Sequence, residues 1–515
     1  MVTESPREET ARCFGLCILN LLLLPFSILG VCIYALRGSI VYFGSRIRSQ
    51  NGSRSELSQR TILVTGVGMA KGLTLARSFY LSGHRVIGAD FENSGIPCSG
   101  RYSRSVSAFY RLSRPDTDDG KESYVSSLLD IIQAENVELW VSCSGVASAI
   151  EDAEAKESIE KYTSCKCIQF DVNTTSALHE KNSFMSECKT LGLPVPETYE
   201  VKSKNDILRT LSRRATSTSG RKFILKPTGM DDAYRADMTL LPLPSKVETE
   251  KHISRLPISD SNPWILQQFI PGGEEYCTHA LVVRGEVRCF VACSSAELLM
   301  HYKALPQNSP LWQAMLAFTI EFVRRWPGSE DMTGHLSFDF MASEGAVNYE
   351  GFQKNIYAIE CNPRAHTAVV LFAQQGPEMD AMVQAYLSVV EQSPHQMATS
   401  LVGGGGLPAS VESILAIPPA NAQPRYWIGH DLVSLFIYPA YQWSTGSADI
   451  SYALSKTLEF RSHLLLWKEG TFEIWDPLPA LSLYHIYFPL TVLFAWWQGK
   501  HWTRINVSTT KMFSR

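Results

Sequence analysis

Short apolar runs alternate with helical patterns in the stretch that begins at residue 61. Thr61–Thr65 (TILVT) predicts a strand, and a glycine-rich turn and a helical pattern follow it. Residues 85–89 (RVIGA) predict a second strand that closes on Asp90, and residues 138–142 (ELWVS) predict a further one. Strands alternating with helices are typical of a parallel sheet with helices on its faces. We therefore predict an α/β, Rossmann-like domain at this place in the chain.

The turn after the first strand carries Gly66, Gly68 and Gly72, and Asp90 follows at the ribose position of a dinucleotide fingerprint. The spacing is G-x-G-x-x-x-G, one residue off the usual form. We favour a Rossmann-like domain without nucleotide, and an NAD(P)-dependent oxidoreductase is the alternative. Ser142 and Ser144 follow the later strand, where such folds place ligands; they are substrate candidates or parts of an ordinary turn.

Two lysines stand at positions that suit phosphate oxygens. Lys181 lies near the start of a predicted helix, and Lys226 ends the apolar strand 222–226 (KFILK). A lysine at the end of a buried strand costs desolvation free energy unless an anion meets it. Phosphate groups supply such an anion.

A strand that leads into a Pro-Gly turn follows at residues 264–270 (WILQQFI), and Glu274 and Glu275 stand directly behind the turn. Main-chain groups in such a segment can read the edge of adenine, and a carboxylate can accept the ribose hydroxyls. The segment predicts an adenosine pocket.

Two further strands carry hard oxygen ligands. Residues 336–340 (LSFDF) place Ser337 and Asp339 on one face, and residues 357–364 (YAIECNPR) do the same for Glu360 and Asn362. Mg²⁺ prefers carboxylate and amide oxygens together with water and nucleotide phosphates. We predict that Asp339, Glu360 and Asn362 form a magnesium site.

The composition fits a folded protein with some lipid contact. The chain has 515 residues, 45% hydrophobic and 19% charged, which predicts several units rather than one core. The formal net charge of −4 gives no reason to expect nucleic acid as a partner. The twelve cysteines are scattered and are predicted to be reduced thiols in a cytosolic domain.

An apolar segment near the N-terminus predicts a membrane anchor. Residues 13–36 contain no charge and are long enough for a spanning helix. Pro25 lies in the middle, where it kinks one spanning helix or marks the tip of a shallow hairpin. The arginines that follow favour a body that faces the cytosol. Near the other end, the 14 residues 484–497 are strongly apolar but too few to span; they predict an interfacial segment or a packed hydrophobic element.

The order of these motifs resembles the ATP-grasp superfamily over about residues 61 to 392. The resemblance implies a Rossmann-like pre-grasp domain and two α+β lobes that close on ATP. It implies phosphate contacts from Lys181 and Lys226, and magnesium held by Asp339, Glu360 and Asn362 (with Mn²⁺ as an alternative). Arg364 stabilises the transferred phosphoryl group in this resemblance. Adenine and ribose contacts are implied for Gln267, Gln268, Ile270 and for Glu274 or Glu275.

A closer resemblance is to the group of ATP-grasp ligases that make mycosporine-glycine. It rests on VTGVGMAKGLTLARSFYLSGHRV, PWILQQFIPGGEEYCTH, IECNPRAH, PRYWIGHD and DPLPALSLYH. In that group ATP activates a cyclohexenone through an enolic oxygen, which implies an acid or enolic substrate, an amine or amino-acid co-substrate and secondary metabolism.

The sequence thus predicts an anchor and linker over residues 1–60 and a pre-grasp domain over 61–175. An ATP-grasp domain over 176–392 and a C-terminal extension over 393–515 follow. The predicted reaction is phosphorylation of a carboxylate or vinylogous acid, with release of ADP, and then displacement of phosphate by the amine. The rivals are the oxidoreductase and a catalytically inactive, membrane-tethered binding module.

Overall fold

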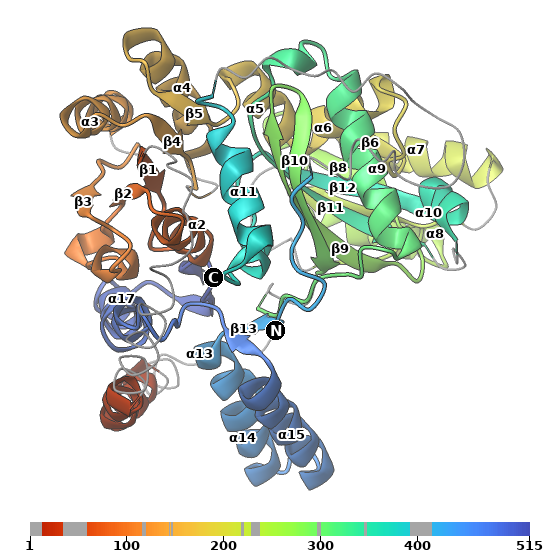
Figure 1. The fold of residues 1–515 in the computed structure, drawn as a ribbon. Coiled ribbons are helices and arrows are strands. Elements are labelled where there is room, and N and C mark those ends of the chain that lie inside the picture. The colour runs from red at the N-terminus through yellow and green to blue at the C-terminus, as the bar shows by residue number, and fades with distance from the viewer. Residues whose placement is uncertain are drawn as a thin grey trace.

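The computed structural model describes residues 13–33, 59–115, 120–143, 145, 148–217, 221–227, 237–295, 300–343, 348–391 and 415–514. Within these ranges it contains a five-stranded parallel sheet, a three-stranded and a four-stranded antiparallel sheet, and a mainly helical C-terminal part with two small two-stranded sheets. Figure 1 shows how these parts are arranged. The predicted mixed α/β content is confirmed.

The parallel sheet lies in the N-terminal part of the described chain. Its strands run in the order β3-β2-β1-β4-β5, and every neighbouring pair is parallel, which is the doubly wound arrangement. The strands are β1 (Thr61–Thr65), β2 (Arg85–Asp90), β3 (Ala108–Arg111), β4 (Leu139–Val141) and β5 (Lys166–Ile168). The helices between them are α2 (Ala70–Leu81), η1 (Asn93–Gly95), η2 (Ser99–Tyr102), α3 (Gly120–Glu135) and α4 (Ala149–Tyr162).

A three-stranded antiparallel sheet follows after α5 (Val172–His179) and α6 (Lys181–Thr190). Its order is β6-β8-β7, from β6 (Thr198–Val201), β7 (Phe223–Pro227) and β8 (Trp264–Gln268). Helices α7 (Lys204–Ser217) and α8 (Lys246–Ser254) belong to the same unit and bury apolar side chains against it. The predicted strands 222–226 and 264–270 are therefore neighbours, although the second ends at Gln268 rather than at residue 270.

A four-stranded antiparallel sheet in the order β10-β9-β11-β12 forms the centre of the molecule. It contains β9 (Glu274–Val283), β10 (Glu286–Ser294), β11 (Gly334–Ala342) and β12 (Ile356–Asn362). One face packs on α6 and α9 (Pro310–Arg325), and the other on η6 (Thr367–Phe372) and α11 (Pro377–Leu387). The turn η5 (Ser329–Asp331) and the helix α10 (Tyr349–Asn355), which lies between β11 and β12, complete this region.

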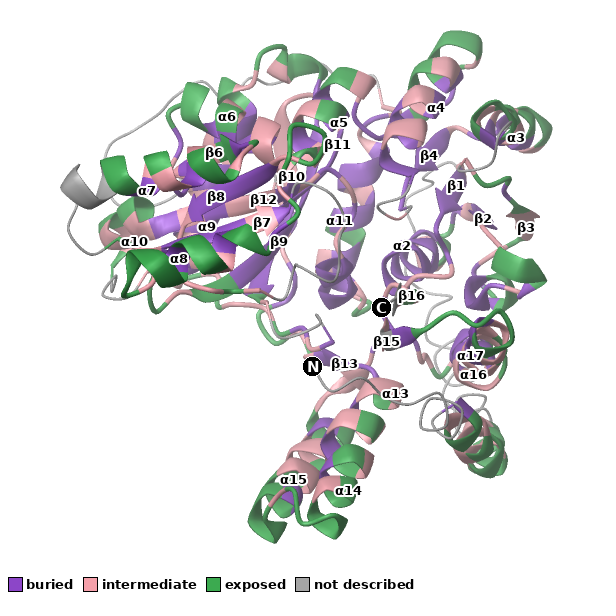
Figure 2. Ribbon diagram, turned by 180° about the vertical axis from the view of Figure 1, so that it is seen from behind, coloured by how far each residue is buried: buried purple, intermediate pink, exposed green. Residues whose placement is uncertain are grey.

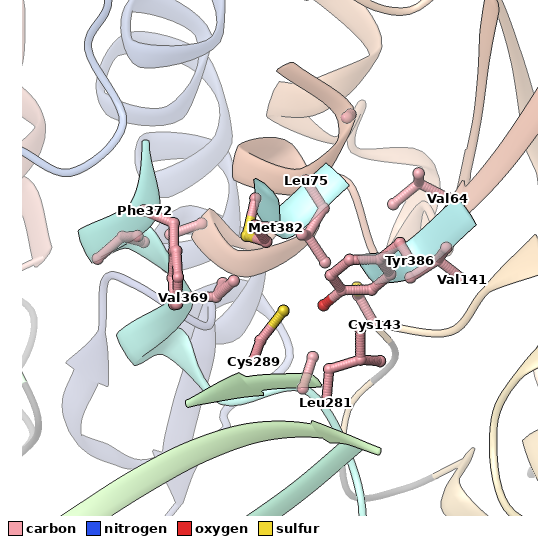
Figure 3. Close-up of a cluster of buried hydrophobic side chains, with 14 of the residues drawn as sticks. Val64, Leu75, Val141, Cys143, Leu281, Cys289, Val369, Phe372, Met382 and Tyr386 are labelled. Carbon is pink, nitrogen blue, oxygen red and sulfur yellow. The ribbon is translucent and has the colours of Figure 1, made fainter. Parts of the chain in front are cut away.

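One hydrophobic cluster joins the parallel sheet to the central sheet. Figure 3 shows Val64, Leu75 and Cys143 from the first unit facing Leu281 and Cys289 of the central sheet. Met382 and Tyr386 of α11 fill the space between them and are fully buried. At about 25 cal/mol per Å² of buried apolar surface, this packing strongly favours a fixed arrangement of the two units.

The C-terminal extension returns to the parallel sheet. Its elements are β13 (Arg425–Tyr426), α13 (Ile428–Asp431), η7 (Leu432–Ile437), α14 (Tyr438–Ser444), α15 (Ile450–Leu466), β14 (Lys468–Glu469), α16 (Leu478–Ser482), η8 (Leu483–Tyr487), α17 (Phe488–Trp497), β15 (Trp502–Asn506) and β16 (Lys511–Ser514). Asp476 accepts a hydrogen bond from Arg77 Nε at 2.8 Å in a buried ion pair, and Ala70 N donates to Ser508 O at 2.9 Å. Both contacts attach the extension to α2.

Among the described residues, two apolar helices are long enough to cross a membrane by length and composition alone. The first, Cys13–Ile33, is one continuous helix through Pro25, so the shallow-hairpin alternative is wrong. The second is Leu478–Trp497, 20 residues, which corrects the estimate of 14 because α16, η8 and α17 join end to end. It is partly buried against the body, and its Trp496 ring meets Phe14 at 5.2 Å between centroids.

The cysteines agree with the prediction of reduced thiols. All twelve are free, and ten of them are buried. Figure 2 shows the burial pattern as a whole: the strands and α2 are buried, whereas the hairpin of α14 and α15 and the N-terminal helix carry many exposed positions.

Candidate active site

The pairing of β11 with β12 brings the predicted metal ligands together. Asp339 lies directly opposite Glu360, and Ser337 lies opposite Asn362. Directly opposed residues of an antiparallel pair project to the same face. Asn362 Nδ2 donates to Asp339 Oδ2 at 3.3 Å. The three oxygen-bearing side chains therefore share one patch of the sheet surface.

The two lysines reach the same region from two different elements. Lys181 is the first residue of α6, and its Nζ lies 3.0 Å from Glu360 Oε2. Lys226 lies on β7 and donates from Nζ to Gln267 Oε1 at 2.9 Å. A helix start and a strand of the smaller sheet thus present cations toward the carboxylates of the central sheet.

Glu275 connects the two sheets electrostatically. Glu275 of β9 lies opposite Met341 of β11, and Met341 is two residues after Asp339 on the same strand. Residues two apart on a strand project to one face, so Glu275 and Asp339 share a face of the sheet. Loss of hydration raises the pKa of Glu275, while Lys226 lowers it and Glu360 raises it further. Glu274 projects to the other face, where its carboxylate accepts a hydrogen bond from Tyr276 Oη at 2.5 Å.

Asp339 is strongly perturbed by its surroundings. Burial raises its pKa well above the usual range, and the nearby Glu360 and Glu275 raise it further, while Arg364 and Lys181 oppose them. Asp339 and Glu360 are half-buried and Glu275 is exposed, and the three carboxylates lie close enough to repel one another, a repulsion that a divalent cation relieves. The donor set of two carboxylates and one amide fits Mg²⁺ by ligand type.

The residues predicted to contact adenine differ in the direction of their side chains. Gln267 and Gln268 are consecutive on β8, so their side chains project to opposite faces. Gln267 is buried beside Thr198 and Lys226, whereas Gln268 Oε1 accepts from Glu197 N at 3.2 Å. Ile270 is buried, and a Cβ at Gly273 would lie 2.8 Å from Met341 Cε of β11, so this turn packs closely on the central sheet.

Arg364 follows β12 and faces the same acids. Burial lowers its pKa, and Glu360 and Asp339 raise it. Within the described residues its Nη1 is a buried donor without a hydrogen-bond acceptor. Such a donor is costly unless a ligand meets it. This geometry suits an anionic group bound beside Asn362.

Several buried polar residues next to this site were not predicted. Lys71 of α2 donates from Nζ to Ala365 O at 3.0 Å, and His366 N donates to His279 Nδ1 at 3.2 Å. These bonds hold the segment that follows Asn362. Burial lowers the pKa of Lys71 to about 7 and that of both His279 and His366 to about 3, so the imidazoles are neutral at pH 7. The only local sequence signal was a lysine between Gly68 and Gly72 of the glycine-rich segment.

The backbone amides at the glycine-rich turn donate hydrogen bonds to other parts of the protein. Gly68 N donates to Asp90 Oδ2 at 2.6 Å, so the residue at the ribose position is engaged by the turn. The amide of Ala70 at the start of α2, where a pyrophosphate binds in dinucleotide sites, donates to Ser508 O. Gly66 has a φ of +71°, and a Cβ there would lie 2.5 Å from Cys143 O. The glycines are explained by internal packing, which disfavours the oxidoreductase alternative.

Of the two serine candidates, the structure describes Ser142, which takes no part in this cluster. Ser142 Oγ donates to Asp152 Oδ2 at 2.9 Å and is buried. Ser144 lies outside the described residues.

No protein-family model matches the chain, and no curated protein matches it by sequence. Among solved structures, it is similar to an N5-carboxyaminoimidazole synthetase from Staphylococcus aureus, at 16% identity and a TM-score of 0.45. That alignment covers 67% of this chain and 81% of the other. A carboxyaminoimidazole ribonucleotide synthase from Aspergillus clavatus, solved with ATP, gives 13% identity and a TM-score of 0.44, covering 71% and 80%.

The biotin carboxylase subunit of pyruvate carboxylase gives 12% identity and a TM-score of 0.43, covering 66% of this chain and 71% of the other. All three TM-scores lie below 0.5, so this likeness alone decides neither the fold nor the activity of the chain. The function has to be inferred from the site residues.

Proposed function

We propose that this chain is an ATP- and Mg²⁺-dependent ligase of the ATP-grasp type that activates a small acid and joins it to an amine. The observation that carries the proposal is the meeting of two lysines, three carboxylates, an amide and an arginine where the two antiparallel sheets face each other. These residues are Lys181, Lys226, Glu275, Asp339, Glu360, Asn362 and Arg364.

The nucleotide lies between the two sheets in this proposal. Lys181 and Lys226 hold the phosphates, and Gln267, Gln268 and Ile270 frame the adenine through side-chain and main-chain groups. Gln267 is the better placed of the two glutamines, because it already contacts Lys226. Glu275 is the better candidate for the ribose, because Glu274 faces away and is engaged by Tyr276.

Asp339, Glu360 and Asn362 would hold Mg²⁺, which neutralises charge on the terminal phosphoryl group. Arg364 binds the anionic acid and then the transferred phosphoryl oxygens, because its buried Nη1 has no acceptor among the described residues. The acid oxygen attacks the γ-phosphorus and ADP leaves. The amine nitrogen then attacks the activated carbon, and phosphate and a proton are released. Fixed cations beside the transferred group stabilise its charge, and closure of the two sheets on the nucleotide would exclude water and favour this transfer over hydrolysis.

The finer assignment rests on the resemblance in sequence motifs. It makes the acid a carboxylate or an enolic, vinylogous acid, the co-substrate an amine or amino acid, and the pathway a secondary-metabolite one. The helix Cys13–Ile33 would anchor the protein in a membrane, with the catalytic units facing the cytosol. The proposed unit limits are residues 1–60, 61–175, 176–392 and 393–515.

The test is nucleotide chromatography on the full-length protein with Mg²⁺, a panel of carboxylic and enolic acids, and a mixture of amino acids. Formation of ADP that depends on the acid, with a condensed product that depends on the amine, supports the proposal. Formation of AMP contradicts it, because the cationic groups and the magnesium ligands would then serve the α-phosphate. Absence of turnover with intact ATP binding favours the inactive binding module.

A further inference from the structure

A cluster of two histidines and an aspartate lies outside the proposed active site. His301 follows β10, Asp431 ends α13, and His463 lies on α15. His301 Nε2 is 2.8 Å from Asp431 Oδ1, and His463 Nδ1 is 2.7 Å from Asp431 Oδ2. One ligand atom from each residue lies within 4.8 Å of the others. Three segments, one of them 130 residues before Asp431 and another 32 residues after it, therefore converge on one carboxylate.

The burial of Asp431 makes this cluster unusual. The residue has 0% exposure, and its ion-pair partners among the described residues are the two imidazoles. A buried carboxylate requires a compensating positive charge. The rings of Trp467 and His463 are 4.3 Å apart and cover one side, while the side chain of His301 keeps 20% exposure on the other.

We propose that His301, Asp431 and His463 bind a divalent transition-metal ion, zinc by preference, as a structural clamp. Two imidazole nitrogens and one carboxylate suit zinc, with a water in the fourth position. The ligand atoms now lie at hydrogen-bond separation. An ion about 2.0–2.1 Å from each nitrogen needs them a few tenths of an ångström further apart, which small rotations of the side chains supply. The ion would fix the base of the α14–α15 hairpin to the strand region beside His301.

The test is elemental analysis of the full-length protein purified without a polyhistidine tag. The expected result is about one zinc per chain in the wild type and its loss in His463→Gln. The controls are His252→Gln on α8 and Glu360→Ala, which both keep the zinc, because neither touches the cluster. The Glu360→Ala control also separates this site from the proposed magnesium site.

A second measurement keeps the proposal testable if His463→Gln does not fold. Cobalt added to chelator-treated wild-type protein should give visible d–d absorption that zinc abolishes, and chelation should lower the melting temperature. A wild-type protein that carries no transition metal, shows no cobalt spectrum and melts at the same temperature with chelator overturns the proposal. In that case the hydrogen bonds from the two imidazoles hold Asp431 without a metal ion.

An independent observation concerns the hairpin itself. Thirteen large hydrophobic side chains between residues 428 and 466 are exposed, whereas only five are exposed between residues 59 and 391 of the described chain. The most exposed are Leu465 at 69%, Leu466 at 68%, Tyr441 and Leu458 at 61%, and Leu454 at 57%. Water-soluble surfaces rarely gather apolar side chains at this density.

The position of the hairpin indicates what covers it. In both Figure 1 and Figure 2 the hairpin and the helix Cys13–Ile33 project from the same side of the body. The latter helix is the membrane-span candidate near the N-terminus, with Leu21 at 69% and Phe26 at 71% exposure. A bilayer that receives the helix therefore meets the hairpin as well.

We infer that the α14–α15 hairpin inserts into the interface of that bilayer and forms a second membrane contact. Tyr438, Tyr441 and Trp443 suit the level of the lipid head groups. The hairpin also carries Lys456 and Glu459, which pair at 2.7 Å, so it lies in the interface rather than crossing the hydrocarbon core.

The test is site-specific photo-crosslinking of the full-length protein in phosphatidylcholine vesicles. A benzophenone amino acid replaces Leu458 in one variant and Val247, which is 73% exposed on α8, in the matched control. Crosslinks from position 458 to lipid, at least tenfold above those from position 247, are expected. Crosslinks from position 458 to a second copy of the chain, or equal yields at the two positions, overturn the inference.

Discussion

Lys71 offers a direct test of the packing between α2 and the segment that carries Arg364. Its side chain is 3% exposed, and burial, together with nearby Arg364, lowers its pKa from 10.5 to about 7. Between those two values the unfolded chain binds a proton that the folded chain does not. The free energy of unfolding must therefore rise with pH in this window, by up to about 1.4 kcal/mol per pH unit.

The change is Lys71→Met, which keeps the length of the side chain and removes the charge. From pH 7.5 to 9.5, the wild type should gain about 2.5 kcal/mol relative to the variant, obtained by integrating the proton-binding difference over the window. The hydrogen bond to Ala365 O is lost in the variant at a cost of about 1 kcal/mol, but this loss does not depend on pH and cancels in the comparison.

The assay is urea-induced unfolding in detergent, followed by tryptophan fluorescence, at several pH values for both proteins. The control is Lys166→Met, since Lys166 lies exposed on β5 and its removal should leave the pH dependence unchanged. A difference between wild type and Lys71→Met that stays flat from pH 7.5 to 9.5 would refute the reasoning, because Lys71 would then be hydrated in the folded state.

Three further predictions concern the active site and the anchor. Glu360→Ala should lower ATP turnover about a hundredfold, equivalent to about 3 kcal/mol of transition-state stabilisation. The control Glu350→Ala, on the exposed face of α10, should leave the turnover unchanged. If Glu360→Ala retains more than about a tenth of the wild-type rate, Glu360 is not a ligand of the metal. Arg364→Lys should keep ATP binding but lower the acid-dependent release of ADP at least tenfold, because a lysine cannot reproduce the planar fork of guanidinium donors. An unchanged rate in steady-state kinetics would argue against the binding of the acid and of the transferred phosphoryl group by Arg364. Deletion of residues 1–48 should weaken membrane binding sharply in flotation assays without loss of activity, and full retention of binding shifts the anchor to the hairpin or to Leu478–Trp497.

Local apolar patterns predicted the strands that carry the candidate site. β1, β2, β7, β8, β11 and β12 all lie where short apolar runs predicted strands, so the placement of Lys226, Asp339 and Glu360 on strands followed from short segments alone. β3 was missed because Ala108–Arg111 is a short edge strand with no fully buried residue. The helix of Leu478–Trp497 was underestimated because its start contains two prolines that local pattern does not assign to a helix.

Contacts between distant segments could not be predicted in this way. Nothing near His301 indicates that Asp431 and His463 will meet it, and nothing near Lys71 indicates that its partner is Ala365, 294 residues further along the chain. Such contacts follow from the packing of whole units, which depends on all their surfaces together. The neutral state of His279 and His366 also follows only from their burial in the folded protein.

The attachment of the C-terminal extension to α2 has a consequence for the order in which the chain is made. Arg77 finds its buried carboxylate at Asp476, and Ala70 N finds its acceptor at Ser508. Domains usually fold as they leave the ribosome, beginning with the first. Here the first sheet emerges hundreds of residues before the partners of its own helix, so α2 exposes an unpaired arginine and a free amide until residues 476 and 508 have been made. A chain that stops before residue 476 should therefore be damaged at α2 as well as at the segment that is missing.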